Sequence, residues 1–392
     1  MDDEVRQLYY ILYRQLSTSY QILYGWLSHD ALKYHNDAIS LGKKAGDESE
    51  LAGLLFWRWS AQLMSLDLPH VRTLAQELLQ RGLTEKNASI WSEAHVALAS
   101  ALFWLGDNQE VLTCLARSKL LTAPCQYADQ QGLDLVGMAL TLKGLALFQQ
   151  GEFKKSKEIA KKLASRAMGE DIIAFHRVIS LRGAAWLACL FEDSDSLGRL
   201  THELASQAQQ YGFTFYQGLA KVLKGCYLLT QHDYVQAKQY MAEGGDSHLF
   251  CQEGKLFHSF QAWKRGELLL QSGEPQLCDV LMSQALDLAF KHQERAYLSE
   301  LMEVKARARL ALNDIVGAEQ GFRCAITTAQ TLGIVPAQII ATSELARLLN
   351  QSQRKAEAVA LLSSILKNID SQLAPPFVNR AIQLLAELDK AE

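Results

Sequence analysis

The stretch Leu142-Lys143-Gly144-Leu145-Ala146-Leu147-Phe148-Gln149-Gln150-Gly151-Glu152-Phe153 decides the fold, because its spacing recurs along the chain. Gly144, a small residue, is followed by Gly151 seven positions later, by Phe153 two further on, and by small Ser156 three beyond that. The same offsets recur in five other sets, which are Ala99-Gly106-Asn108-Val111, Gly225-His232-Tyr234-Ala237, Gly266-Gly273-Pro275-Cys278, Ala306-Asn313-Ile315-Ala318 and, more weakly, Ala346-Gln353-Lys355-Ala358. Ser60 begins a partial copy, and Gly183 begins one with a longer turn.

The first small residues of these sets fall at positions 60, 99, 144, 183, 225, 266, 306 and 346, a spacing of 39 to 45 residues. In this respect the chain resembles a tetratricopeptide-repeat protein, whose standard repeat has about 34 residues. The resemblance implies that each small residue lies in the first helix of a hairpin and lets the second helix approach closely. Because the period is longer than the standard one, we expect longer helices or larger connections between repeats.

We therefore predict an all-α fold: a right-handed α-solenoid of about nine tetratricopeptide-like hairpins with a C-terminal capping helix. The whole chain, 1–392, forms a single superhelix in this interpretation, with an aromatic-rich N-terminal hairpin at 1–48, repeats at 49–373 and the capping helix at 374–392. No alternating pattern predicts a strand. All prolines fall at predicted connections, namely Pro69, Pro124, Pro275, Pro336, Pro375 and Pro376.

Charge and composition exclude several classes of partner. The net charge is -4, from 39 basic and 43 acidic side chains, so no general attraction to nucleic acid or to an anionic membrane is expected. The N-terminus, Met1-Asp2-Asp3-Glu4, lacks the basic and apolar segments of a secretory signal. No apolar run approaches the roughly 20 residues of a membrane-spanning helix. We predict a cytoplasmic protein that binds neither membrane nor nucleic acid directly.

No catalytic or metal-binding motif is present, so we predict a protein that is not an enzyme and needs neither metal nor cofactor. The ten histidines include no H-x-x-x-H or H-E-x-x-H pair, and the seven cysteines include no C-x-x-C pair. No G-x-S-x-G turn is found for a nucleophilic serine. The acidic residues are scattered over predicted helix surfaces, which leaves no carboxylate pair for acid–base catalysis.

Two phrases support a second resemblance. They are Trp263-Lys264-Arg265-Gly266-Glu267-Leu268-Leu269-Leu270-Gln271-Ser272-Gly273-Glu274 and Ser343-Glu344-Leu345-Ala346-Arg347-Leu348-Leu349. Together they resemble the C-terminal helical-repeat (sensor) region of bacterial switch-ATPase transcriptional regulators and adenylate-cyclase-linked predicted ATPases, of the maltose-activator type. The phosphate loop G-x-x-x-x-G-K-[ST] of such ATPases is absent, so their ATPase, DNA-binding and cyclase activities do not follow.

The tetratricopeptide resemblance also implies a concave groove lined by the first helices. Residues six before, three before and one after each small residue would point inward. These offsets select the candidate binding residues Arg177, Ser180, Phe260, Trp263, Glu267, Glu303 and Arg307, with Leu219, Val222, Cys226 and Glu300 beside them. An apolar and aromatic centre flanked by charges suits a ligand with an apolar body and polar ends. The alternative is that longer helices close the groove and these side chains simply pack.

Two further surfaces are candidates for docking a partner. Tyr9 and Tyr13 belong to an aromatic stripe of the N-terminal hairpin, which either packs on the next hairpin or forms an interface. Lys154, Lys155 and Lys161 belong to a basic helix, which is either a solvated face or a contact for an acidic partner.

The predicted function is a non-catalytic binding module in bacterial signalling or transcriptional regulation. It would recognise a protein segment, a peptide or a small inducer in the concave groove. The alternative is a stand-alone scaffold that bridges proteins through its ends or its convex face.

Overall fold

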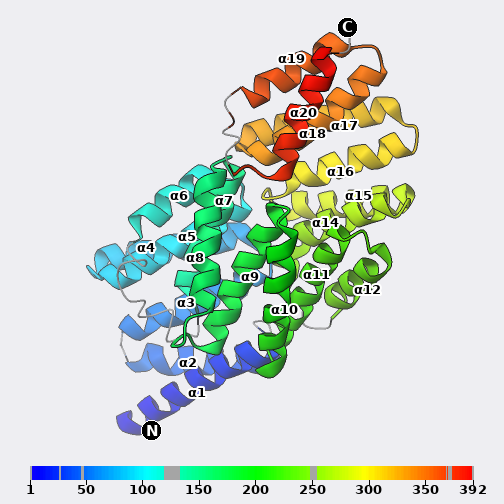
Figure 1. Cartoon of the computed structure of the whole chain (residues 1–392). Coiled ribbons are helices and arrows are strands. Elements are labelled where there is room, and N and C mark those ends of the chain that lie inside the picture. Colours follow the sequence, from blue (N-terminus) through cyan, green and yellow to red (C-terminus); the bar gives the residue numbers. More distant parts are fainter. Residues whose placement is uncertain are drawn as a thin grey trace.

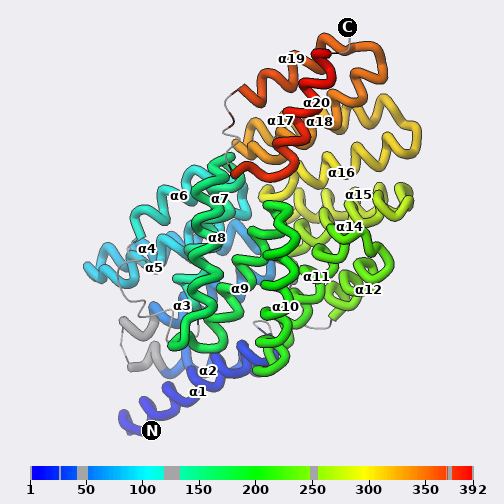
Figure 2. Tube along the Cα trace, viewed as in Figure 1, coloured from blue at the N-terminus to red at the C-terminus, as the bar shows by residue number. Residues whose placement is uncertain are grey.

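The computed structural model describes residues 2–25, 28–45, 48–118, 133–247, 254–367, 369 and 373–390. These residues form nineteen α-helices and one short 3-10 helix, with no strand among them. Consecutive helices run antiparallel and stack into a curved solenoid, as Figure 1 and the tube in Figure 2 show. The predicted all-α solenoid is therefore confirmed.

Eighteen of the described α-helices pair as nine hairpins, and the last helix covers the end of the array. In chain order the pairs are α1 (Asp3–Tyr24) with α2 (His29–Ala45), α3 (Glu48–Met64) with α4 (Leu68–Thr84), α5 (Ala88–Trp104) with α6 (Asn108–Arg117), α7 (Leu135–Gln149) with α8 (Phe153–Ala167), α9 (Ala174–Leu190) with α10 (Ser194–Gln210), α11 (Thr214–Thr230) with α12 (Tyr234–Gly245), α14 (His258–Gln271) with α15 (Pro275–His292), α16 (Leu298–Ala311) with α17 (Ile315–Leu332), and α18 (Val335–Gln351) with α19 (Lys355–Leu366). The 3-10 helix η2 (Gly254–Phe257) leads into α14, and α20 (Pro376–Lys390) is the last helix.

The turn inside each hairpin follows from the residue seven positions after the small one. In six hairpins this residue has a positive φ: Gly106, Gly151, His232, Gly273, Asn313 and Gln353. The left-handed conformation ends the first helix, and in several hairpins an aspartate then caps the second. The Asp107, Asp233 and Asp314 carboxylates accept hydrogen bonds from backbone N–H groups in the first turn of their helices, at 2.9 to 3.1 Å.

The small residues hold the two helices of a hairpin close together. A Cβ atom on Gly144 would lie 3.2 Å from Ile159 Cγ2 of the paired helix and 2.6 Å from Leu187 Cδ1 of α9, so a larger residue there would require these side chains to shift. The Ser156 hydroxyl of α8 donates a 2.8 Å hydrogen bond to the Gly144 carbonyl of α7. Cys278 Sγ lies 3.4 Å from the Gly266 carbonyl at the same place in a later hairpin. The offsets read from the sequence thus correspond to direct contacts between paired helices.

Prolines begin helices, as their positions predict. Pro69, Pro275 and Pro336 occupy the first two positions of α4, α15 and α18, and Pro376 is the first residue of α20. In this position the missing N–H costs no helical hydrogen bond. Pro124 lies outside the described residues.

The solenoid folds back on itself, so that later hairpins contact earlier ones. The Arg295 backbone N–H donates a 2.8 Å hydrogen bond to the Trp104 carbonyl at the end of α5. Phe377 of α20 packs against Phe148 and Phe153, with ring centroids 6.4 and 6.1 Å apart. Figure 1 shows α18 and α20 lying against the upper end of α7. This seam between the two halves turns part of the concave face into an interior.

Candidate functional site

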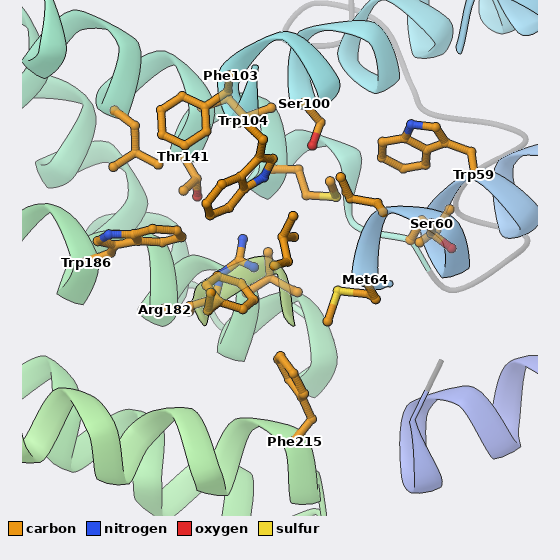
Figure 3. A pocket seen from close by; sticks show the side chains of 18 of the residues that line it. Trp59, Ser60, Met64, Ser100, Phe103, Trp104, Thr141, Arg182, Trp186 and Phe215 are labelled. Atoms are coloured by element: carbon orange, nitrogen blue, oxygen red, sulfur yellow. The ribbon is translucent and has the colours of Figure 1, made fainter. Parts of the chain in front are cut away.

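A partly enclosed cavity lies on the concave side, between the first helices of four successive hairpins and the start of α11. Its wall comes from α3, α5, α7, α9, α11 and η2. The space available to the centre of a water-sized molecule is about 70 Å³, within about 700 Å³ of empty space that includes open solvent. Since one water needs roughly 10–15 Å³ on this measure, several water-sized groups fit. Figure 3 shows aromatic rings from several elements around it, namely Trp59, Phe103, Trp104, Trp186 and Phe215.

Arg182 is the charged side chain of this cavity. Its guanidinium lies below the Trp104 indole in Figure 3, with Trp186 and Trp59 on opposite sides of the cavity. The Nε atom is buried and has no hydrogen-bond partner in the described part of the chain. The guanidinium carbon lies over the Phe257 ring, 5.9 Å from its centroid. Burial lowers the pKa of Arg182, although Tyr216 and Asp134 act in the opposite direction.

Asp134 does not serve as a direct counter-ion for Arg182. Its carboxylate accepts two hydrogen bonds from Arg166, at 2.8 and 2.9 Å, and a third from the Gly137 backbone at the start of α7. These partners fix the carboxylate between the end of α8 and the first turn of α7. The positive charge of Arg182 is therefore left facing the cavity without an ion pair among the described residues.

Some of the other polar groups of the wall have a hydrogen-bond partner, and others have none among the described residues. The Ser60 and Thr141 hydroxyls donate to backbone carbonyls within their own helices, at 2.7 and 2.8 Å. Trp59 Nε1 is buried and finds no acceptor within the described ranges. The cavity thus offers donors that lack acceptors. Buried donors of this kind are normally paired, and leaving them unpaired costs stability.

The predicted groove centre, Phe260 and Trp263, is packed into an aromatic wall rather than left open. Trp263 is 7% exposed and Phe260 only 1%. The Phe260 ring lies 5.2 Å from Trp186 and the Trp263 ring lies 5.6 Å from Tyr297, measured between centroids. Both side chains are packed in this wall, and their role in binding stays a prediction. Their wall separates the Arg182 cavity from the charged residues of the later hairpins.

The predicted residues Glu267, Glu303 and Arg307 lie together on the far side of this wall. Lys264 Nζ is 3.0 Å from Glu267 and 3.6 Å from the centroid of the Trp263 ring. Arg307 lies 3.7 Å from Glu303. Burial raises the pKa of Glu303 to about 8 and that of neighbouring Glu300 to about 7. These groups form a mutually compensating cluster with little free volume, about 40 Å³ beside Trp263.

Arg177 and Ser180 do not reach the cavity. Arg177 donates a 3.0 Å hydrogen bond to the Gly169 carbonyl, after the end of α8. The Ser180 hydroxyl is buried and donates to the His176 carbonyl at 3.0 Å. The lining residues of α9 are instead Ile179, Arg182 and Trp186, which the fixed offsets missed. Their spacing of three and then four residues, ending in an aromatic, is the signal that would have identified this face.

The proposed docking residues are at the surface to different degrees. Tyr9 is exposed and Tyr13 is half-buried against Tyr34, with ring centroids 5.9 Å apart. Lys154, Lys155 and Lys161 are exposed on α8, and Lys155 pairs with Glu152 at 2.9 Å. Across the described residues there is no group of three or more histidine, cysteine, aspartate or glutamate side chains arranged to hold a metal ion. None of the described helices is long and apolar enough to cross a membrane.

Comparison with known proteins identifies relatives by fold only. No family model matches the sequence. No curated protein matches it either. Among solved structures, a Rap protein complexed with competence and sporulation factor is similar at 11% identity and a TM-score of 0.55, covering 88% of this chain and 100% of that one. Cut9 in the APC/C Cut9–Hcn1 hetero-tetramer (13% identity, 93% and 74% coverage) and yeast Tom70 (12%, 98% and 96%) align with lower TM-scores of 0.38 and 0.30. The Rap similarity supports the helical-repeat solenoid and nothing more specific.

Proposed function

We propose that this chain is a non-catalytic receptor that binds a ligand inside its solenoid. The observation that carries the proposal is the cavity at Arg182, an apolar and aromatic space with a half-buried cation that makes no ion pair among the described residues. Such a space, mostly apolar with a few directed polar groups, is what ligand sites usually are. It departs from the sequence-based hypothesis in position, because it lies among earlier hairpins than Trp263 does. The ligand class remains the one proposed from sequence: a protein segment, a peptide or a small inducer.

We extend this proposal to the biological setting in which the chain acts. The phrases around Trp263 and Ala346 resemble sensor regions of bacterial transcriptional regulators, so we place the chain in cytoplasmic signalling or transcriptional control. The Rap structure holds competence and sporulation factor, which is consistent with a solenoid of this kind receiving a partner. A ligand would control such a protein only if it bound two states of the solenoid with different affinity. The seam between the halves is the element that would differ between those states.

A cavity-filling variant tests the receptor proposal. Ser100 lines the cavity from α5 and is buried, so Ser100→Phe would occupy the space with a ring. The matched control is Val235→Phe, at a site that is 81% exposed on α12. Each protein is purified from the source cell and denatured, and the released small molecules and peptides are identified by mass spectrometry. The native chain and the control should release the same species, and Ser100→Phe should have lost it.

Retention of that species by a folded Ser100→Phe variant would contradict binding in the cavity. Circular dichroism and a thermal melt establish that the variant is folded. If the melt shows unfolding, the smaller substitution Ser100→Leu replaces it.

A scaffold role is the second candidate, and one observation favours it. Val5, Leu8, Tyr9 and Leu12 follow helical spacing along α1 and are between 40% and 67% exposed. An apolar stripe of this kind suits a protein interface. The double variant Leu8→Lys, Leu12→Lys should abolish partner binding if the scaffold hypothesis holds. A receptor that acts through its interior would keep its ligand after the same change.

A further inference from the structure

The only charged side chain among the described lining residues is a cation, Arg182, which restricts what the cavity accepts. Arg182 supplies a cation and Trp59 an N–H group, and the buried atoms Arg182 Nε and Trp59 Nε1 have no hydrogen-bond partner among the described residues. No carboxylate belongs to the lining set. An amine ligand would therefore find no counter-charge, and a neutral apolar ligand would leave the guanidinium unpaired. A half-buried cation without an ion pair is best matched by an opposite charge, so an anionic ligand is the one that this site stabilises.

The number of cationic side chains in the cavity indicates whether the anionic group of the ligand is a phosphate or a carboxylate. A phosphate monoester carries nearly two negative charges and three strong acceptor oxygens at neutral pH, and proteins usually meet it with several donors. This cavity contains one guanidinium. A carboxylate carries one charge and accepts two parallel hydrogen bonds from a single arginine. One arginine in an otherwise apolar wall therefore fits a monocarboxylate better than a phosphate.

The size and surface of the cavity define the rest of the ligand. About 70 Å³ for water-sized centres is less than the roughly 150 Å³ of an engineered cavity that binds benzene. The buried part of the ligand must therefore be a short aliphatic group. Trp59, Phe103, Trp104 and Phe215, with Met64, would contact it. The position of Arg182 beneath Trp104 in Figure 3 would orient the ligand with its charged end toward α9.

From these contacts we infer that the cavity binds a compact monocarboxylate: a carboxylate held by Arg182, with a short branched or linear aliphatic body among the aromatic rings. The inference rests on the proposed receptor function and specifies its ligand. The same chemistry is offered by a free short-chain acid and by the C-terminus of a peptide that ends in an aliphatic residue. The experiment below distinguishes these two sources.

The test compares matched ligands on the native full-length chain. The probes are 3-methylbutanoate and its neutral isostere 3-methylbutanamide, titrated by calorimetry and by the fluorescence of the cavity tryptophans. A second pair is a short peptide ending in valine, with a free or an amidated C-terminus. The acid should bind at least tenfold more tightly than its amide, because a charge-assisted hydrogen bond is roughly twice as strong as a neutral one. Tighter binding by the free-ended peptide than by the small acid would identify the peptide as the source.

Variants locate the charge that is responsible. Arg182→Met should bind acid and amide equally weakly, and Arg182→Lys should recover part of the preference for the acid. Arg199→Met, on the exposed side of α10, should behave like the native chain. Because Met is apolar and of similar length, it avoids leaving a buried charge unpaired.

The outcomes separate this inference from the proposed function. Equal affinity for 3-methylbutanoate and 3-methylbutanamide would overturn carboxylate recognition while leaving an interior receptor intact. Tighter binding of 3-methylbutyl phosphate than of the acid would also overturn it. If neither the acid nor the free-ended peptide bound at millimolar concentration, the monocarboxylate assignment would fall. The Ser100→Phe experiment would then decide the receptor proposal independently.

Discussion

The backbone N–H of Arg295 donates a hydrogen bond to the carbonyl of Trp104 across 2.8 Å, joining the connection between α15 and α16 to the end of α5. Glu192 and Arg380 make a second link, through two hydrogen bonds of 2.7 and 2.8 Å. Together these contacts bring residues from distant hairpins into one seam. The seam buries the aromatic wall around Tyr297 and leaves the Arg182 cavity on its N-terminal side. An open solenoid of the same hairpins would instead expose that wall to water.

Alanine substitutions at two glycines in equivalent turns compare a turn that contacts the other half of the solenoid with one that does not. Gly151 and Gly273 both have a left-handed φ, of 80° and 74°. A Cβ on Gly151 would lie 3.0 Å from Val335 Cγ1 across the seam, whereas nothing lies within 4 Å of one on Gly273. Gly273→Ala should cost only the backbone strain, about 1 kcal/mol. Gly151→Ala should cost about 1 kcal/mol more, measured by urea denaturation. Equal losses would show that Val335 does not lie against Gly151 in the folded chain.

Neighbouring glycines at the end of α12 test close helix packing. A Cβ on Gly244 would lie 2.6 Å from the Gly218 carbonyl oxygen and 2.8 Å from the Val222 backbone nitrogen in α11. Gly244→Ala should therefore reduce the free energy of unfolding by about 2 kcal/mol, since backbone atoms cannot move aside cheaply. Gly245 has only the ends of two flexible side chains nearby, Gln261 at 3.2 Å and Arg265 at 3.9 Å. Gly245→Ala should be neutral or stabilise the helix by up to about 1 kcal/mol. The reverse order of stability would contradict this packing.

Buried Glu294 should make stability fall as the pH rises. Burial raises the pKa of this carboxyl from 4.5 to about 8, and the Ser259 hydroxyl that donates to it offsets only part of the effect. Between these values the folded chain keeps a proton that the unfolded chain releases. Stability therefore decreases with a slope of up to about 1.4 kcal/mol per pH unit across this window and levels off above it.

The variant Glu294→Gln removes this contribution, because its amide does not titrate. Urea denaturation at several values between pH 5 and pH 8 should give a flatter dependence for the variant than for the native chain. Glu300 and Glu303 act in the same direction and remain in both proteins, so the difference between the two curves isolates Glu294. Curves of equal slope would mean that Glu294 is already ionised in the folded chain.

The hairpins could be predicted from sequence because their signals are local. Gly144, Gly151 and Ser156 lie within one helical pair, and their spacing records direct contacts between the two helices. The predicted position of the turn residue was wrong in hairpins whose turn has a different length. In the second hairpin the left-handed residue is Leu66, and in the fifth it is Glu192, so both turns fall one or two positions away from the common offset.

The candidate binding site could not be predicted in the same way, because its position depends on contacts between distant hairpins. Whether Trp263 faces a groove or a packed wall is decided by Tyr297 and the seam, which no spacing within a repeat encodes. The sequence positions whose side chains face the interior also differ from one helix to the next. In α7 the offsets select Met138, Thr141 and Leu145, which do line the cavity, but in α9 they select Arg177 and Ser180 instead of Arg182.

The most direct test of this account is a crystal structure of the native chain grown with 3-methylbutanoate. Ligand density is expected inside the cavity, with the carboxylate within hydrogen-bonding distance of the Arg182 guanidinium and the aliphatic group against Trp104 and Phe103. Density only on the outer surface, for example along α1, or a cavity that stays free of the acid while an outside site is filled, would contradict an interior receptor for carboxylates.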